Sequence, residues 1–180
     1  MAPIDLYDTS VGLYIKSCHS LRAILIKAKD HAGPEGNTSL ASARLYEDML
    51  PLSFQVQLVS NLSKKATERI VPQKAPYPVW EDNETTLDEL IARVDKTLDL
   101  LQKINPADVL GKDDEVVEVG MGTRGTATAH VKGYVLGHSL PNIFFHVTAA
   151  YAILRSKGVP LGKSDYLGPY LEGNLLTPPK

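Results

Sequence analysis

The stretch TLDELIARVDKTLDLLQKI, from Thr86 to Ile104, is the clearest helical segment of the chain. Thr86 and Glu89 have the spacing of a capping box, in which each side chain binds the other residue's backbone N–H at a helix start. Apolar residues then recur at intervals of three and four, the period of one helical face: Leu87, Leu90, Ile91, Val94, Leu98, Leu101 and Ile104. Asn105-Pro106 ends this pattern. We therefore predict an amphipathic helix that buries one face against other elements.

The N-terminal part of the chain predicts two more helices of the same kind. The first covers residues 5–31, and the run Ala32-Gly33-Pro34-Glu35-Gly36 is expected to end it. A short helical segment is expected at residues 39–48. The second long helix opens at Pro51, a residue favoured in the first turn, and stops before Pro72.

The C-terminal part predicts a hairpin followed by a last helix. Apolar and polar residues alternate within residues 115–131, on either side of a glycine-rich turn at 120–125, which is typical of a β-hairpin. The last helix is expected at 134–157, with a kink at Pro141. Its expected core face is Leu136, Leu140, Ile143, Phe144, Val147, Tyr151 and Leu154. Residues 159–180 are rich in glycine and proline and are expected to be irregular.

These elements predict a mainly α protein, a four-helix bundle with one β-hairpin inserted before the last helix. Four amphipathic helices bury their apolar faces most simply against one another. Residues 72–83 contain three prolines and are expected to form an extended crossover between the second and third helices. The whole chain, residues 1–180, has the length of a single domain.

Composition argues against several classes of partner. The net charge is -2 and both signs are interspersed, whereas a nucleic-acid-binding protein needs a concentrated basic face. The N-terminus has no apolar run behind a basic start, so no signal peptide is expected. The most apolar stretch, residues 143–154, is shorter than the about 20 residues that span a bilayer. We therefore expect a cytoplasmic protein with no nucleic-acid or membrane partner.

The run Gly120-Met121-Gly122-Thr123-Arg124-Gly125 matches the letters of a dinucleotide-binding fingerprint. That mechanism requires a helix to start after the glycines, so that its N–H groups meet the pyrophosphate. A strand-like segment follows here instead. The run is therefore predicted to be a hairpin turn that binds no nucleotide.

His146 is the strongest candidate for chemistry. It lies in the most apolar predicted helix, on the same side as Asn142. One interpretation is a buried histidine that is hydrogen-bonded to a neighbour. The other is a histidine that faces an internal pocket and moves a proton near neutral pH. No pair of the five histidines has the helical spacing of metal ligands, so we predict no metal and no other cofactor.

A second group of candidates lies around the start of the second long helix. Arg44 and Asp48 are four residues apart, which would place them together on a helix as a surface ion pair or at a pocket mouth. Gln55 lies in an apolar neighbourhood, where an amide needs a partner or solvent. We take His146, Arg44 and Asp48 as candidate catalytic residues. The candidate substrate-binding residues are Gln55, Tyr151, Asn142 and Tyr46.

Several motifs resemble those of a known family: Leu140-Pro141-Asn142, then Phe145-His146-Val147-Thr148, and the run NETTLDEL at residues 83–90. They are similar to a fungal and bacterial family of unknown function in the DinB/YfiT-like superfamily of four-helix bundles. The resemblance implies the bundle fold. Proteins of that superfamily typically hold a metal with three histidines and often dimerise, so it also implies a homodimer. This chain departs from the metal pattern, because Ala150 stands one turn after His146.

Our first functional hypothesis is a small cofactor-independent enzyme that binds an apolar or aromatic metabolite in the bundle. His146 would act as acid or base in an isomerisation, cyclisation or elimination, of which chalcone-isomerase-like ring closure is one example. The first alternative is a non-catalytic protein that binds a small molecule or acts as a dimeric interaction module. The second alternative is a DinB-like metalloenzyme that uses His146 with ligands from other helices.

Overall fold

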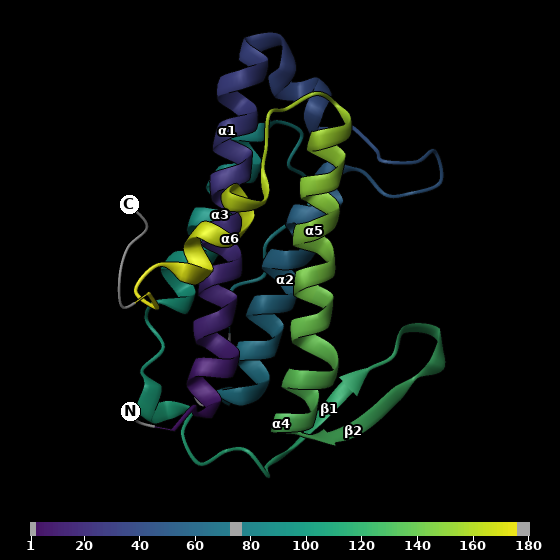
Figure 1. The fold of residues 1–180 in the computed structure, drawn as a ribbon. Helices are drawn as coiled ribbons and strands as arrows, with labels where there is room; N and C mark the ends of the chain where they lie inside the picture. Colours follow the sequence, from purple (N-terminus) through teal and green to yellow (C-terminus); the bar gives the residue numbers. More distant parts are fainter. Residues whose placement is uncertain (1–2, 73–76, 176–180) are drawn as a thin grey trace.

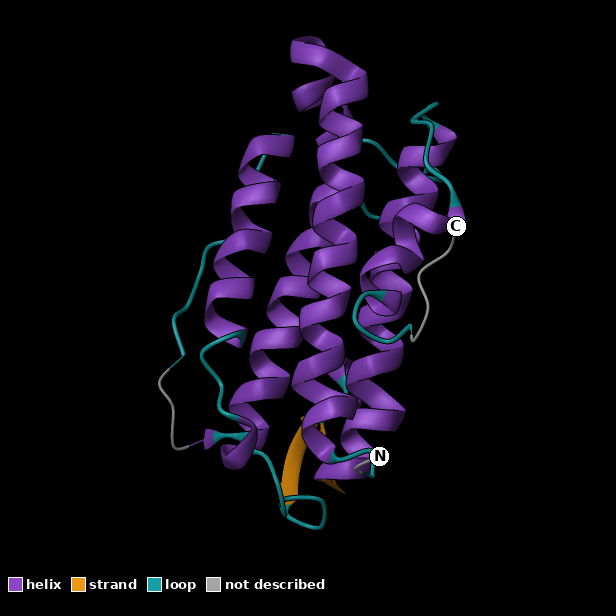
Figure 2. Ribbon diagram, turned by 60° about the vertical axis from the view of Figure 1, so that its left-hand side comes forward, coloured by secondary structure: helices purple, strands orange, loops and turns teal. Residues whose placement is uncertain are grey.

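The computed structural model describes residues 3–72 and 77–175, and it confirms the predicted helical bundle with one hairpin (Figure 1). Four long helices run side by side (Figure 2). They are α1 (Leu13–Ala41), α2 (Leu52–Ile70), α3 (Leu87–Leu101) and α5 (Leu140–Ser156). Residues 73–76 of the expected crossover and 176–180 of the expected tail lie outside the described residues.

The core forms where the apolar faces of these helices meet. α1 packs against α3 and α5, and α2 packs against the same two helices. The Thr86 hydroxyl accepts from the Glu89 N–H at 3.2 Å and Glu89 accepts from the Thr86 N–H at 3.1 Å, so the predicted capping box is confirmed. Fully buried residues come from all four helices: Tyr14, Leu21, Leu25, Val56, Val59, Leu90, Leu101, Ile143 and Val147.

α1 is longer than predicted, and the expected end at residues 32–36 is wrong. A π-helical turn at Asp8–Gly12 leads into α1, which continues to Ala41. Only Gly33 leaves the helical conformation, with φ 61° and ψ -167°. Helix resumes at once because Pro34 suits the first turn of a new helical segment. The break is therefore a kink of one residue.

The helix expected at residues 39–48 is also wrong beyond Ala41, because residues 42–51 form a loop. The Ala43 carbonyl accepts from the Leu52 N–H at 2.9 Å, which closes this loop at its base. Leu50 precedes Pro51, and a residue before proline is disfavoured in helical conformation. The loop projects from the bundle beside the start of α2 (Figure 1).

The hairpin consists of β1 (Val116–Gly120) and β2 (Thr126–His130), antiparallel, with Glu118 opposite Thr128. The predicted hairpin is therefore confirmed. Gly122 and Gly125 adopt φ of 62° and 87° in the turn, which favours glycine over residues with a side chain. β2 follows Gly125 directly, whereas a pyrophosphate site of this type needs the start of an α-helix at that place.

The last helix is divided by a π-helical turn. α4 (Val131–Tyr134) passes through Val135–Ser139, with its wider turn, into α5. A proline ring crowds the carbonyl four residues earlier, here Gly137, and the wider turn accommodates Pro141. This turn also rotates the preceding residues relative to α5. Leu136, expected in the core, is consequently 60% exposed.

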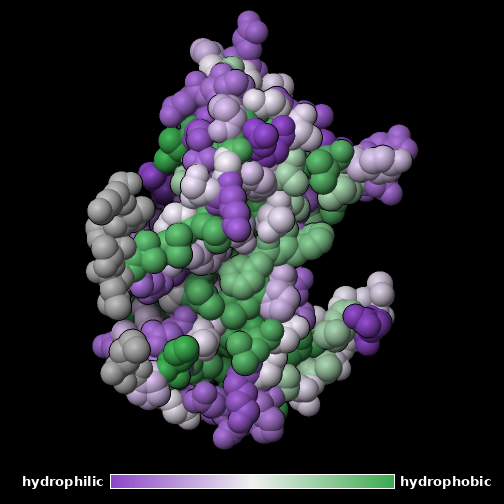
Figure 3. Space-filling model, in the orientation of Figure 1, coloured by the Kyte–Doolittle hydropathy of each residue, from purple (hydrophilic) through white to green (hydrophobic). Residues whose placement is uncertain are grey.

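The segment from residue 159 was expected to be irregular, but it contains α6 (Lys163–Leu171), which packs across α1. The Tyr166 carbonyl accepts from the Ser20 hydroxyl at 2.8 Å, and Asp165 pairs with Lys27 at 2.9 Å. Figure 3 shows apolar side chains gathered on the face where α5 and α6 lie in Figure 1. Among the helices within residues 3–72 and 77–175, none combines the length and apolar character needed to cross a bilayer.

Candidate functional site

The structure brings His146 and Gln55 together across the contact between α5 and α2. The His146 Nδ1 lies 2.7 Å from the Gln55 Oε1. The Gln55 Nε2 donates to the Leu50 carbonyl at 3.0 Å. Because this bond orients the amide, its oxygen faces the imidazole, and the proton must reside on the histidine Nδ1. The neutral ring therefore carries its free lone pair on Nε2.

Burial and aromatic neighbours define the surroundings of His146. The imidazole is half-buried, and it contacts the rings of Phe54 and Phe145 edge-on, with centroids 6.2 and 5.1 Å away. Desolvation lowers the pKa of His146 below its ordinary value, because burial disfavours the charged imidazolium. His146 is thus a neutral base at pH 7, oriented by an amide that is itself held in place.

His146 lies at the contact between α2 and α5, between a buried and an exposed neighbour. Its neighbour Val147 on α5 is fully buried, whereas Phe145 is 61% exposed. Figure 3 shows the molecule hollowed between two projecting parts, which Figure 1 identifies as loop 42–51 and the hairpin. Gln55 belongs to the first turns of α2, directly behind this loop. His146 therefore lies at partial depth between α2 and α5, and an internal pocket around it stays a prediction.

Arg44, Asp48 and Tyr46 lie in the exposed part of loop 42–51. The predicted helical pairing of Arg44 with Asp48 is wrong, because this segment is not helical and no ion pair joins the two within the described chain. The Arg44 guanidinium instead donates to the Met49 carbonyl. Arg44 thereby braces the backbone next to Leu50, whose carbonyl holds Gln55.

The two remaining candidates belong to α5. Asn142 lies one turn before His146, on the same face of the helix. Its Nδ2 donates to the His138 carbonyl at 2.7 Å. The Tyr151 hydroxyl donates to the Leu161 carbonyl at 3.5 Å. Tyr151 is five residues from His146, which places it about 140° around the helix. Asn142 therefore shares the side of His146, whereas Tyr151 joins α5 to the segment before α6.

The side chains around His146 do not fit a three-histidine metal centre. Its polar partner is the Gln55 amide, and Ala150 occupies the position one turn later. Within residues 3–72 and 77–175, no three His, Cys, Asp or Glu side chains converge in a way that could hold a metal ion. An amide and an alanine cannot replace two imidazoles as ligands.

We expect the purified protein to contain less than about 0.1 equivalent of zinc, nickel or iron after dialysis against a weak chelator, because tight transition-metal sites need three or four such ligands. Elemental analysis by mass spectrometry measures this directly. About one equivalent that survives dialysis, and that is lost in His146→Ala, would contradict the expectation.

A buried arginine that is not among the candidates predicted from the sequence anchors the crossover. Arg93 on α3 is 1% exposed and occupies a position on the apolar face, between Leu90 and Val94. A charged residue at a core position was the signal that could have identified it. All five of its N–H groups have acceptors, at 2.8 to 3.0 Å: Ser60 Oγ, Asn61 Oδ1, the Glu81 carbonyl, Asp82 Oδ1 and Glu84 Oε1.

Comparison with solved structures agrees with the bundle architecture. The chain is similar to a crystal structure described as a DinB family member protein from Shewanella denitrificans, with 33% sequence identity and a TM-score of 0.80. The match covers 91% of this chain and 92% of the other. No curated protein matches the chain. The fold is therefore that of a DinB-like helical bundle.

The particular family follows from the sequence match. Residues 6–167 match the family described as a domain of unknown function (DUF1993), and the chain belongs to it. The predicted relationship to a DinB-like family of unknown function is confirmed. The homodimer, the cytoplasmic location and the extent of the domain over residues 1–180 stay predictions.

Proposed function

We propose that this protein is an enzyme that moves a proton on an apolar, aromatic metabolite, with His146 as the general base. The observation that carries the proposal is the chain of hydrogen bonds from the Leu50 carbonyl through Gln55 to the His146 Nδ1. A base that is oriented by a further group is the usual arrangement in acid–base catalysis.

The reaction class follows from what the residues can do. The His146 Nε2 takes a proton from a C–H or O–H group of the substrate, and the electron pair of that bond moves into the substrate's π system. In an isomerisation or ring closure the imidazolium returns the proton to another substrate atom, so that no cofactor is consumed. Elimination differs only in that a leaving group accepts the electrons.

The surroundings of His146 support an aromatic substrate. Phe145, whose ring contacts the imidazole, is 61% exposed, and Leu50, whose carbonyl accepts from Gln55, is 47% exposed. Aromatic rings pack well edge-to-face against Phe54 and Phe145. In this proposal Asn142 contacts the substrate, and Arg44 is a positioning residue that acts through the loop backbone. Asp48, Tyr46 and Tyr151 have no role supported by their contacts.

The proposal is tested with 5-nitrobenzisoxazole, a flat aromatic compound that reports on any base beside an apolar surface. Removal of its C3 proton breaks the ring N–O bond and releases a coloured nitrophenolate. We expect saturable turnover whose rate rises with pH as His146 loses its proton, with a midpoint below its ordinary value of about 6.5. Above the midpoint the rate should be constant, because the base is then fully neutral.

Two results would contradict this assignment. One is turnover no faster than in buffer that contains an equal concentration of free imidazole. The other is a rate that keeps rising above about pH 9, which would indicate a lysine or tyrosine as the base.

A further inference from the structure

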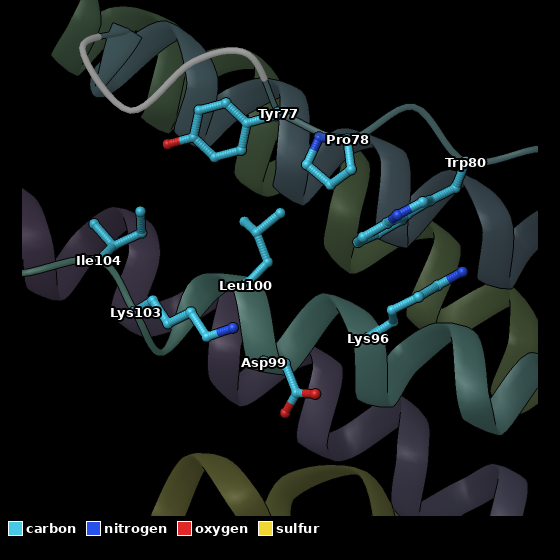
Figure 4. Close-up of a pocket in the computed structure, with 8 residues that line it drawn as sticks. All are labelled: Tyr77, Pro78, Trp80, Lys96, Asp99, Leu100, Lys103 and Ile104. Atoms are coloured by element: carbon cyan, nitrogen blue, oxygen red, sulfur yellow. The ribbon is translucent and has the colours of Figure 1, made fainter.

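A second hollow, distant from His146 in the sequence, lies between residues 77–80 and α3 (Figure 4). Its volume is about 470 Å³. Tyr77 and Pro78 form one wall. The other wall is formed by Leu100 of α3 and by Ile104, which follows the end of this helix. Trp80 closes one end. We call this hollow the Trp80 groove.

The shape and walls of the groove suit a flat ring. Two layers of aromatic and aliphatic side chains face each other across it, as Figure 4 shows. Pockets that bind small molecules are typically about 300–1,000 Å³ and mostly apolar, with a few polar groups that orient the ligand. The groove therefore has the size and the walls of a binding site for a small aromatic molecule.

Trp80 is held by cations. The Lys64 Nζ lies 4.6 Å, the Arg93 Cζ 5.2 Å and the Lys96 Nζ 4.8 Å from the centroid of its ring. Cations at such distances are attracted to the negative face of an indole. Lys64 also donates to the Pro78 carbonyl, and Arg93 binds Glu81 and its neighbours. The wall of the groove is thus fixed before any ligand arrives.

Lys96 and Lys103 differ from Lys64 and Arg93 in their exposure and partners. Both are exposed, and neither has a hydrogen-bond acceptor or ion-pair partner among the described residues. Among the described residues that line the groove, Asp99 is the single acidic side chain, so this lining carries one excess positive charge. An apolar slot with an excess of positive charge at its edge favours an aromatic ligand that carries one negative charge.

We propose that the Trp80 groove binds a flat aromatic monoanion of the arylcarboxylate class. The ring lies between the Tyr77–Pro78 wall and Leu100, and the carboxylate accepts hydrogen bonds from Lys96 and Lys103. This site is independent of the base at His146, because it is built from α3 and the crossover and not from α2 and α5. Either proposal can fail without the other.

The test uses trans-cinnamate as the anionic probe and trans-cinnamamide as its neutral counterpart. Trp80 is the only tryptophan of the chain, so its indole N–H gives one distinct signal in a ¹H–¹⁵N correlation spectrum. We expect a saturable shift of this signal with cinnamate, and binding about tenfold weaker or more with the amide, which lacks the charge-assisted hydrogen bonds. No saturable shift up to about 10 mM probe, or equal affinity for both probes, would overturn the proposal.

Variants of exposed residues sharpen this test without disturbing the core. Lys96→Met and Lys103→Met should each weaken cinnamate binding about fivefold or more, and Asp99→Asn should strengthen it about threefold, because like charge opposes the carboxylate. Lys157→Met is the matched control, since Lys157 ends α5, which packs on α1 and α2. Affinities unchanged in all three groove variants, or lowered equally in the control, would refute the assigned contacts.

Discussion

Replacing Arg93 with methionine is expected to lower the free energy of unfolding by about 3–5 kcal/mol. The methionine fills much of the same space, so the effect comes from the lost hydrogen bonds and charge. Arg93 joins α3 to α2 through Ser60 and Asn61, and to the crossover through Glu84, whose side chain is only 9% exposed. Without the guanidinium, the Glu84 carboxylate is left nearly buried with only Gln57 as a partner.

Denaturant unfolding followed by circular dichroism measures this loss, and Arg22→Met is the matched control. Arg22 on α1 pairs with Asp95 on α3, the helix that also carries Arg93, but the side chains of this pair are 40% and 43% exposed. An exposed pair of this kind contributes at most about 1 kcal/mol. Arg93→Lys should fall between the two, because an ammonium has three donors in place of five. If Arg93→Met costs no more than Arg22→Met, Arg93 does not anchor the crossover.

His146→Phe is expected to reduce proton-transfer turnover of 5-nitrobenzisoxazole by about 10²- to 10⁴-fold, the usual contribution of a positioned base. Phenylalanine has a ring of similar shape and keeps most of the packing against Phe54, but it cannot accept a proton. Gln55 loses its partner at the same time, which costs about 1–3 kcal/mol of stability. The variant should therefore be folded but inactive, as judged by turnover and a melting curve.

His31→Phe serves as the control, because His31 is exposed on α1. It should keep wild-type turnover. Gln55→Leu separates positioning from catalysis: the base is retained but its tautomer is no longer held, so turnover should fall less than in His146→Phe. A destabilised His146→Phe that still turns over the probe at the wild-type rate would show that this histidine is structural.

The elements that depend on near neighbours could be predicted from the sequence. The Thr86–Glu89 capping box, the helical period behind it and the alternation that forms the hairpin all act over a few residues. Such signals are local, because backbone hydrogen bonds and side-chain spacing repeat along one segment. Four such segments with apolar faces allow few arrangements, so the bundle also followed. The resemblance to a DinB-like family pointed the same way.

The pairs of polar side chains that come into contact could not be predicted in this way. His146 and Gln55 are 91 residues apart in the chain, and nothing near either residue specifies the other as its partner. The same holds for Arg93, whose acceptors come from α2 and the crossover. Helix α6 forms despite Gly168 and Pro169 because it packs on α1. Such contacts depend on how whole helices pack against one another. This packing is determined by the burial of the entire core and is not specified by any local sequence pattern.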